Sequence, residues 1–415
     1  MKRIFVTVGL LAIMFSLVGW SPSSDFLTPQ YPQPFPPLSP TQPTPEGNTQ
    51  QSSAINPLTG LPVDDPSALQ YPPAMLSITN WPLSARPQAG LSYVSMVYEL
   101  YIGDGESRFL SMFYGDYPTT EVQGDQVTSQ TGSQNNGGSV DTSLGPLRSG
   151  RLPYEPLRQF YNGFLVMASG WKGVLSNLSS FNNYYGTDSD SITSAFVGVT
   201  DLKQIAGASE QRVDPYGLAV NKFESAPPVG GSNAPDFWFI YNALNQVHWQ
   251  YDPQQEAYIR YQDQADGQTF VAASDRLNGE TLTMENVIVL FADHRYCTKY
   301  AFDIDLMYID KAPALLFRDG KVYQIYWTTK NAEYEFTTGK LRPIRFIDAD
   351  GNPFPMKPGQ TWVHLVPSFT RYWEAPQTTD LYQMLNNEQP GSGNWVTRFY
   401  ESLMVYDEEV CNRIR

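Results

Sequence analysis

Histidine and cysteine are scarce in this sequence of 415 residues. Its three histidines are His248, His294 and His364, all in the second half, and its two cysteines are Cys297 and Cys411. The sequence contains no Cys-x-x-Cys, His-Glu-x-x-His or Gly-x-Ser-x-Gly motif and no phosphate-binding glycine loop. So few ligand residues complete no zinc site, and we therefore expect no metal and no cofactor.

The two cysteines leave two alternatives open. In an oxidising compartment they can form one long-range disulfide. Otherwise they are two free or buried thiols. The sequence does not decide between these states.

Positive charge is in the minority. The chain has 27 Lys and Arg residues against 42 Asp and Glu residues, which gives a net charge of −15. Nucleic acids and anionic membrane surfaces require a basic face. We therefore expect no nucleic-acid partner, and membrane contact only through the N-terminal segment.

Long hydrophobic runs are also rare, and the clearest one stands at the N-terminus. Lys2 and Arg3 precede about seventeen apolar or small residues, which is typical of an export signal and close to the lower limit for a membrane span. Residues 1–20 are therefore predicted to be a signal peptide or a membrane anchor. Both alternatives place the protein outside the cytoplasm, either secreted or anchored to the cell membrane.

Composition divides the rest of the chain. Residues 21–55 are rich in proline, which predicts an extended linker. Residues 56–225 mix strand and helix patterns, whereas residues 236–367 are short alternating runs broken by Asp-Gly and Asn-Gly turns. The predicted class is α+β, with an N-terminal mixed α/β layer domain and a mostly antiparallel, β-rich C-terminal domain. Residues 368–415 are predicted to form a C-terminal tail.

Within the first domain, several segments have clear patterns. Residues 74–80, 95–102 and 106–117 are rich in apolar and aromatic residues and predict strands. Residues 154–163 predict a short helix, because proline stands near the start and glycine at the end. A low-complexity stretch at 119–143 has no apolar periodicity and predicts a surface loop.

That loop precedes the turn LGPLRSGR at 144–151, which contains two arginines close together. Other charged residues of the first domain flank predicted strand ends, where loops converge. Arginine binds carboxylate or phosphate with two parallel hydrogen bonds, and nearby acidic groups can orient it or transfer protons. The alternative is an internal network of ion pairs. The candidate ligand-binding residues are Arg86, Glu99, Asp104, Glu106, Arg108, Arg148, Ser149 and Arg151.

Several motifs in order resemble the DUF3048 family of exported, often lipoprotein-type bacterial proteins. They are NPLTGLP at 56–62, the stretches at 78–113 and 144–151, LTMENVIVLF at 282–291, LLFRDGKVYQIYW at 315–327 and PGQTWVHLVP at 358–367. The resemblance implies an α/β-like domain followed by a β-rich one, and it brings no established reaction. It also implies that the candidate residues other than Asp104 and Glu106 are positions of the family's motifs.

The sequence departs from the family at two places. Trp20 stands where a lipoprotein would have its lipid-bearing cysteine, which favours a plain signal peptide or a helical anchor. The family often has Pro-His-Asn near the end of the first domain, whereas residues 212–220 contain no histidine.

These observations favour a cell-envelope binding or assembly module over an enzyme. The expected ligand is an anionic or glycan component of the envelope, or a protein partner, held by the arginine turn. The alternative is a hydrolase or transferase of cell-wall polymer, with Glu99 or Glu106 as acid or base and the arginines as a clamp. A third possibility is an assembly factor without a small ligand.

Overall fold

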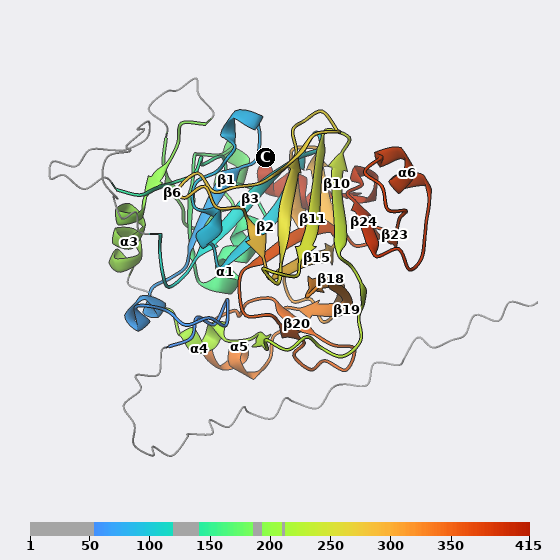
Figure 1. Cartoon of the computed structure of the whole chain (residues 1–415). Coiled ribbons are helices and arrows are strands. Elements are labelled where there is room, and N and C mark those ends of the chain that lie inside the picture. Colours follow the sequence, from blue (N-terminus) through green and yellow to red (C-terminus); the bar gives the residue numbers. More distant parts are fainter. Residues whose placement is uncertain (1–53, 119–140, 186–192, 210–211) are drawn as a thin grey trace, which may run out of the picture. The chain divides into compact units, whose positions relative to one another are not determined.

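The largest sheet of the computed structural model contains strands from both halves of the chain (Figure 1). The structure describes residues 54–118, 141–185, 193–209 and 212–415, which belong to one compact unit. Among these residues the sheet has eleven strands. Its spatial order is β20 (Arg345–Ile347), β19 (Lys321–Thr328), β18 (Ala312–Arg318), β15 (Asn286–Ala292), β22 (Thr361–Pro367), β2 (Met96–Gly103), β3 (Glu106–Phe113), β1 (Ala74–Thr79), β5 (Phe164–Met167) and β6 (Asn182–Asn183), with β9 (Ser232–Asn233) paired to β19.

Strand β22 joins the two segments that the sequence predicts to be separate domains. It lies parallel to β2 on one side and parallel to β15 on the other. Every residue of β15 and β22 is buried, as expected for parallel strands covered on both faces. The two predicted segments, 56–225 and 236–367, therefore contribute to one sheet.

A second sheet packs against one face of the first. Its strands are β13 (Phe270–Ala272), β12 (Ala257–Asp263), β11 (Asn245–Asp252), β10 (Asp236–Asn242), β24 (Asn394–Arg398) and β23 (Tyr372–Glu374), with β14 (Thr283–Met284) paired to β12. The ring centroids of Trp249 and Trp362 are 5.5 Å apart, and those of Tyr101 and Phe399 are 4.3 Å apart. Aromatic side chains thus fill the space between the two sheets.

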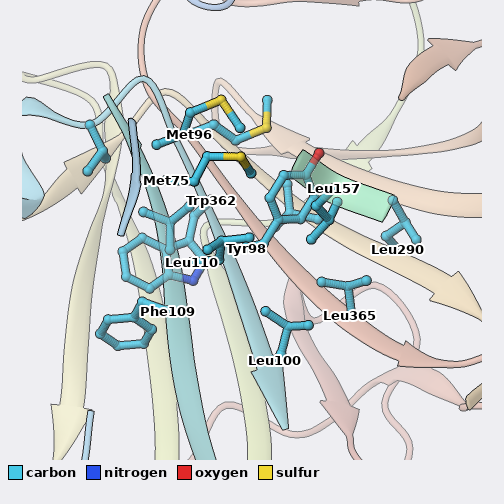
Figure 2. Close-up of a cluster of buried hydrophobic side chains, with 14 of the residues drawn as sticks. Met75, Met96, Tyr98, Leu100, Phe109, Leu110, Leu157, Leu290, Trp362 and Leu365 are labelled. Atoms are coloured by element: carbon cyan, nitrogen blue, oxygen red, sulfur yellow. The ribbon is translucent and has the colours of Figure 1, made fainter. Parts of the chain in front are cut away.

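Helix α1 (Tyr154–Tyr161) packs against the other face of the first sheet. Its apolar positions Tyr154, Leu157, Phe160 and Tyr161 are buried, and Figure 2 shows Leu157 in the same cluster as Tyr98. The Tyr98 and Tyr161 hydroxyls are 2.6 Å apart. This amphipathic pattern explains why residues 154–161 form a helix that lies on the sheet.

The sequence predictions at 74–80, 95–102, 106–117 and 154–163 are confirmed as β1, β2, β3 and α1. The α+β class is confirmed as well. The predicted tail, 368–415, contributes two strands to the second sheet and two helices. The remaining helices are α2 (Lys172–Leu175), α3 (Val199–Ala208), α4 (Pro215–Leu218), α5 (Glu333–Thr338), α6 (Leu381–Asn386) and α7 (Glu408–Ile414), and the remaining strands are β4 (Ser143–Leu144), β7 (Val197–Gly198), β8 (Lys222–Phe223), β16 (His294–Thr298), β17 (Ala301–Ile304), β21 (Pro355–Met356) and β25 (Val405–Tyr406).

Of the two alternatives for the cysteines, the structure contains the disulfide. Cys297 of β16 is bonded to Cys411 of α7, and their Cα atoms are 4.8 Å apart. The bond spans 114 positions of the sequence and attaches the C-terminal helix to the body of the protein.

Three sequence predictions concern residues outside the described part. They are the export segment at 1–20, nearly all of the linker at 21–55, and most of the loop at 119–143. Among the described helices, none has the length and apolar character needed to cross a membrane.

Candidate functional site

Strand alternation separates the candidate residues into groups. In the antiparallel pair of β2 and β3, Glu99 is opposite Phe109, whereas Arg108 is opposite Leu100. Directly opposite residues share a face, and neighbours along a strand point to opposite faces. Glu99 therefore faces the second sheet, while Arg108 faces the side that α1 covers. Glu106 is two positions from Arg108 and is on the same face as Arg108.

Glu99 lies in a buried polar network between the sheets. It is 0% exposed, and it accepts hydrogen bonds from the Ser107 hydroxyl at 2.6 Å and the Trp362 indole at 2.9 Å. The buried guanidinium of Arg260 lies 3.3 Å from its Oε2 atom. Burial acts to raise the pKa of Glu99, but Arg260, the neighbouring His364 and these hydrogen bonds hold it below its usual range. Glu99 is thus the internal counter-ion of Arg260.

His364 belongs to the same buried network. The Trp249 indole donates a hydrogen bond to its Nε2 atom at 2.9 Å. Because an indole N–H can only donate, Nε2 is an acceptor, and the proton of the neutral ring is on Nδ1. Nδ1 lies 3.5 Å from Glu99 Oε2 and 3.4 Å from the Tyr241 hydroxyl. Burial lowers the pKa of His364 to about 3, which keeps the ring neutral.

Arg86 is on the Glu99 side of the sheet. Its Nε donates to the backbone and side-chain oxygens of Asn80, both at 3.1 Å, and Nη1 donates to the Asp263 carbonyl at 2.8 Å. The Asn80 amide in turn donates to Ser107, the residue that binds Glu99. Burial lowers the pKa of Arg86 to about 10.

Asp104 is at the exposed tip of the β2–β3 hairpin, between two glycines. It has a left-handed backbone conformation with φ of 53°. Lys299 contacts its carboxylate at 2.7 Å, and the Tyr300 hydroxyl donates to the other oxygen. This surface ion pair attaches the hairpin tip to the loop after β16.

The predicted arginine turn enters the sheet where β1 and β5 end. These two strands pair in parallel at 74–76 and 164–166. Beyond that point the Arg148 N–H donates to the Ser77 carbonyl, and the Arg148 carbonyl accepts from the Ala168 N–H at 3.0 Å. A side chain at Gly150 would place its Cβ 2.4 Å from the Met167 sulfur, so Met167 would have to move to accommodate it. The turn thus lies at the carboxyl ends of parallel strands, where open α/β sheets usually bind ligands.

Arg108, Arg148 and Arg151 form what we call the arginine trio. Nη1 of Arg108 donates to the Ser149 carbonyl at 2.8 Å and is 3.2 Å from its hydroxyl oxygen. Nη1 of Arg151 lies 3.0 Å from the same hydroxyl oxygen and donates to the Gly150 carbonyl at 2.9 Å. Two guanidinium groups therefore meet at Ser149.

The arginine trio lacks a counter-ion within the described part of the chain. No ion pair with a described residue forms at any of the three guanidinium groups, whereas Arg158 on the neighbouring helix pairs with Glu155 at 2.7 Å. Arg108 is only 4% exposed. The Nε atoms of all three members are buried and have no hydrogen-bond partner. Buried donors without partners are rare in native proteins and need an explanation.

Electrostatics distinguish the arginine trio from an ordinary ion-pair network. Burial lowers the pKa of Arg108, and the neighbouring charges of Arg151 and Arg148 lower it further. Burial also lowers the pKa of Arg151. Glu106, which is exposed, opposes these shifts from a distance without forming an ion pair. The site is thus arranged to favour the approach of a negatively charged group.

Chemically, the arginine trio can hold an oxyanion. The half-buried guanidinium groups of Arg148 and Arg151 and the Ser149 hydroxyl suit a phosphate or carboxylate, because hydrogen bonds between charged groups are short and strong. Two cavities of about 260 and 500 Å³ lie elsewhere and are lined by other residues. No group of His, Cys, Asp and Glu side chains that could hold a metal ion occurs among the described residues.

Sequence reasoning missed the partners of Glu99. Arg260 and His364 come from the second half of the chain, whereas all the candidate residues come from the first. One signal was present, because His364 interrupts the apolar run of 361–367, which indicates a buried polar contact. Tyr154 was missed as well, although its buried hydroxyl lies 3.1 Å from that of Ser77 beside the arginine turn.

The fold and these residues define the class as a β-rich α+β protein whose two halves share one sheet. Comparison with known protein families also distinguishes the two halves of the chain. The model described as "Protein of unknown function (DUF3048) N-terminal domain" matches residues 58–204, and the corresponding C-terminal domain model matches residues 238–363. The chain belongs to the DUF3048 family, and the resemblance seen in the sequence is confirmed.

A curated relative from Bacillus subtilis (strain 168), named "Putative lipoprotein YerB", is similar to this chain. It is 27% identical over 328 residues, which cover 75% of this chain and 86% of that protein. A crystal structure of the YerB protein from Bacillus subtilis has 22% sequence identity and a TM-score of 0.55. The similarity covers 76% of this chain and 97% of that one, and it shows a common fold.

Proposed function

We propose that this protein is an extracytoplasmic binding protein that holds an anionic group of an envelope ligand on the arginine trio. The observation that supports this most is that, among the described residues, three neighbouring arginines have buried Nε atoms without a hydrogen-bond partner and form no ion pair. An oxyanion at the half-buried guanidinium groups of Arg148 and Arg151 would supply the missing counter-charge. The anionic group can belong to an envelope polymer or to a protein partner, since both present phosphate or carboxylate.

Three observations support a location outside the cytoplasm. The sequence of residues 1–20 has the charge and hydrophobicity of an export segment. The protein contains the Cys297–Cys411 disulfide, and disulfides persist in oxidising compartments but are rare in cytosolic proteins. The relative's printed name contains the word lipoprotein. We propose that the N-terminal segment either anchors the protein or directs its secretion.

The geometry favours binding over hydrolysis of a cell-wall polymer. Glycoside hydrolysis generally uses two carboxyl groups on either side of one scissile bond. Glu99 and Glu106 point to opposite faces of β2 and β3, and Glu99 is fully buried against Arg260. One exposed carboxylate, Glu106, remains on the face of the arginine trio, and it does not complete such a pair.

The test is a binding measurement on the full-length protein. Inorganic phosphate, glycerol phosphate, a muropeptide and acetate are titrated by calorimetry, with thermal shift as a second readout. Each charge-assisted hydrogen bond contributes roughly 1.5–3 kcal/mol, so Arg148→Met or Arg151→Met should weaken anion binding about 10- to 100-fold.

The matched control is Arg371→Ala, which removes one positive charge from an exposed pair with Glu388. This variant should bind anions like the wild type. If no anion binds, or if the control loses as much affinity as the trio variants, the arginine trio is not an anion site. Binding of the muropeptide alone, without phosphate or acetate, would point to a ligand recognised mainly by other groups.

A further inference from the structure

A groove of about 500 Å³ lies between strands of both sheets, away from the arginine trio. Tyr323 and Gln324 of β19 come from the first sheet, and Tyr372 of β23 and Trp395 of β24 come from the second. The remaining walls are formed by Leu315, Val322, Phe354, Val229, Gly231 and Ser232. We call it the aromatic groove. Its volume lies in the range of pockets that bury small molecules.

The aromatic groove carries no formal charge, although the chain has a net charge of −15. Burial raises the pKa of Tyr323 and of Tyr372, so both phenols stay neutral at physiological pH. A charged ligand would find no partner on these walls. The lining therefore suits an uncharged ligand.

Four aromatic rings are arranged as two pairs in the aromatic groove. The centroids of Tyr372 and Trp395 are 6.2 Å apart, and those of Tyr323 and Phe354 are 5.5 Å apart. Tyr372, Trp395 and Phe354 are each partly exposed, so ring surface remains accessible. Such surfaces bind the apolar faces of flat or ring-shaped ligands.

The hydrogen-bonding groups of the aromatic groove help to distinguish between two kinds of uncharged ligand, a peptide and a sugar. Grooves that bind proline-rich peptides also use aromatic walls. Here the Trp395 indole donates to the Asn233 carbonyl at 2.9 Å, and the Tyr323 hydroxyl donates to the Pro228 carbonyl at 3.1 Å. These donors are therefore not available to the carbonyls of a peptide.

The polar groups that remain are the exposed side chains of Gln324 and Ser232 and the hydroxyl of Tyr372, which lies beside Gln324. An amide and hydroxyls beside aromatic faces match a sugar ring, which has an apolar C–H face and hydroxyls at its edge. We propose that the aromatic groove is a second binding site, which takes an uncharged oligosaccharide. This inference rests on the groove alone and does not require the arginine trio to bind an anion.

The experiment titrates the full-length protein with N,N′-diacetylchitobiose and maltotriose, observed by saturation-transfer NMR and by tryptophan fluorescence. We expect saturation of the sugar C–H protons and a Kd in the millimolar range. Tyr372→Ala should weaken binding about five- to tenfold. Gln324→Ala changes an exposed side chain, so the protein should stay folded, and it should weaken binding about threefold or more.

Two controls make the result specific. Phe369→Ala removes a ring that is 79% exposed and does not line the aromatic groove, and it should leave sugar binding unchanged. Arg148→Met should also leave it unchanged, which separates this inference from the proposed anion site. The inference is wrong if neither sugar binds, or if both groove variants bind like the wild type. Binding of a peptide of residues 27–46 in place of the sugars would overturn it as well.

Discussion

Replacing Glu99 by glutamine tests whether this residue is an internal counter-ion or a ligand-binding group. The change keeps the size of the side chain and removes its charge. Arg260 would then be a buried cation without a partner, since Glu99 is its ion-pair partner and both side chains are at most 3% exposed. The Trp362 indole and the Ser107 hydroxyl could still bond to the amide.

The expected loss of stability follows from these contacts. Removing one member of a buried ion pair typically costs about 3–5 kcal/mol, because the other charge stays buried. We expect about 3 kcal/mol for Glu99→Gln, since the hydrogen bonds to Ser107 and Trp362 can be kept. Adding Arg260→Met removes the uncompensated charge and leaves an apolar chain against the ring of Trp362. The double variant should therefore recover at least about 1.5 kcal/mol.

The measurement is urea unfolding of the full-length protein and of both variants, followed by tryptophan fluorescence. The control is Asp104→Asn, which breaks the exposed ion pair with Lys299 on the same hairpin. That pair lies in solvent, so the control should lose much less stability than Glu99→Gln. Glu99 and Asp104 each have one cation as the main partner, so comparing the two variants shows how much burial adds to the cost of breaking an ion pair.

One result would refute the reasoning. If Glu99→Gln unfolded within about 0.5 kcal/mol of the wild type, Glu99 would not be the ionised partner of Arg260. If the variant kept its stability but lost binding of phosphate or sugar, Glu99 would belong to a ligand site. That outcome would also make Glu99 a candidate acid or base again.

Three further predictions concern the arginine trio, the histidines and the disulfide. Arg148→Met should leave the free energy of unfolding in phosphate-free buffer unchanged or raise it by up to about 1 kcal/mol, because the Arg148 side chain forms no hydrogen bond or ion pair with the described part of the chain and lies among like charges. A loss of more than about 2 kcal/mol on thermal or urea unfolding would show that it is structural. Burial lowers the pKa of His364 to about 3 and that of His294 to about 4, so the unfolded state binds protons first and stability should fall as the pH drops from about 6.5 to 4. Urea midpoints across this range would measure it, His294→Phe should flatten the slope, and a flat wild-type profile would contradict it. Changing Cys297 and Cys411 to serine should lower the free energy of unfolding by about 2–5 kcal/mol. Urea unfolding of the wild type with and without reductant would check this, and equal midpoints under the two conditions would refute it.

Local patterns in the sequence predicted the elements but not their partners. Runs rich in apolar and aromatic residues identified β2 and β3, and the Gly-Pro and Ser-Gly steps identified the arginine turn. Alternation within each strand does not place Glu99 and Arg108 relative to one another, because their faces depend on the register of the hairpin. An irregularity between Tyr101 and Gly103 shifts this register and places Glu99 opposite Phe109, so that Glu99 and Arg108 point to opposite faces.

The buried network could not be predicted from local patterns. Arg260 meets Glu99 across 161 positions of the chain, and His364 faces Glu99 only because β22 pairs with β2. Strand pairing over such distances depends on the whole fold, and nothing in residues 96–103 specifies which strand lies beside them. Candidate site residues were therefore easier to find than the contacts that decide what they do.

The parallel insertion of β22 between β2 and β15 has a consequence for the order of events during synthesis. When β2 leaves the ribosome, its pairing partner at 361–367 is more than 250 positions from being translated, so one edge of the β1–β2–β3 sheet stays open. A fragment that ends before residue 361 keeps this edge without a neighbour. It also lacks the indole of Trp362 that caps Glu99. The N-terminal half should therefore aggregate when expressed alone, and its soluble expression needs the C-terminal half in the same chain or supplied in trans.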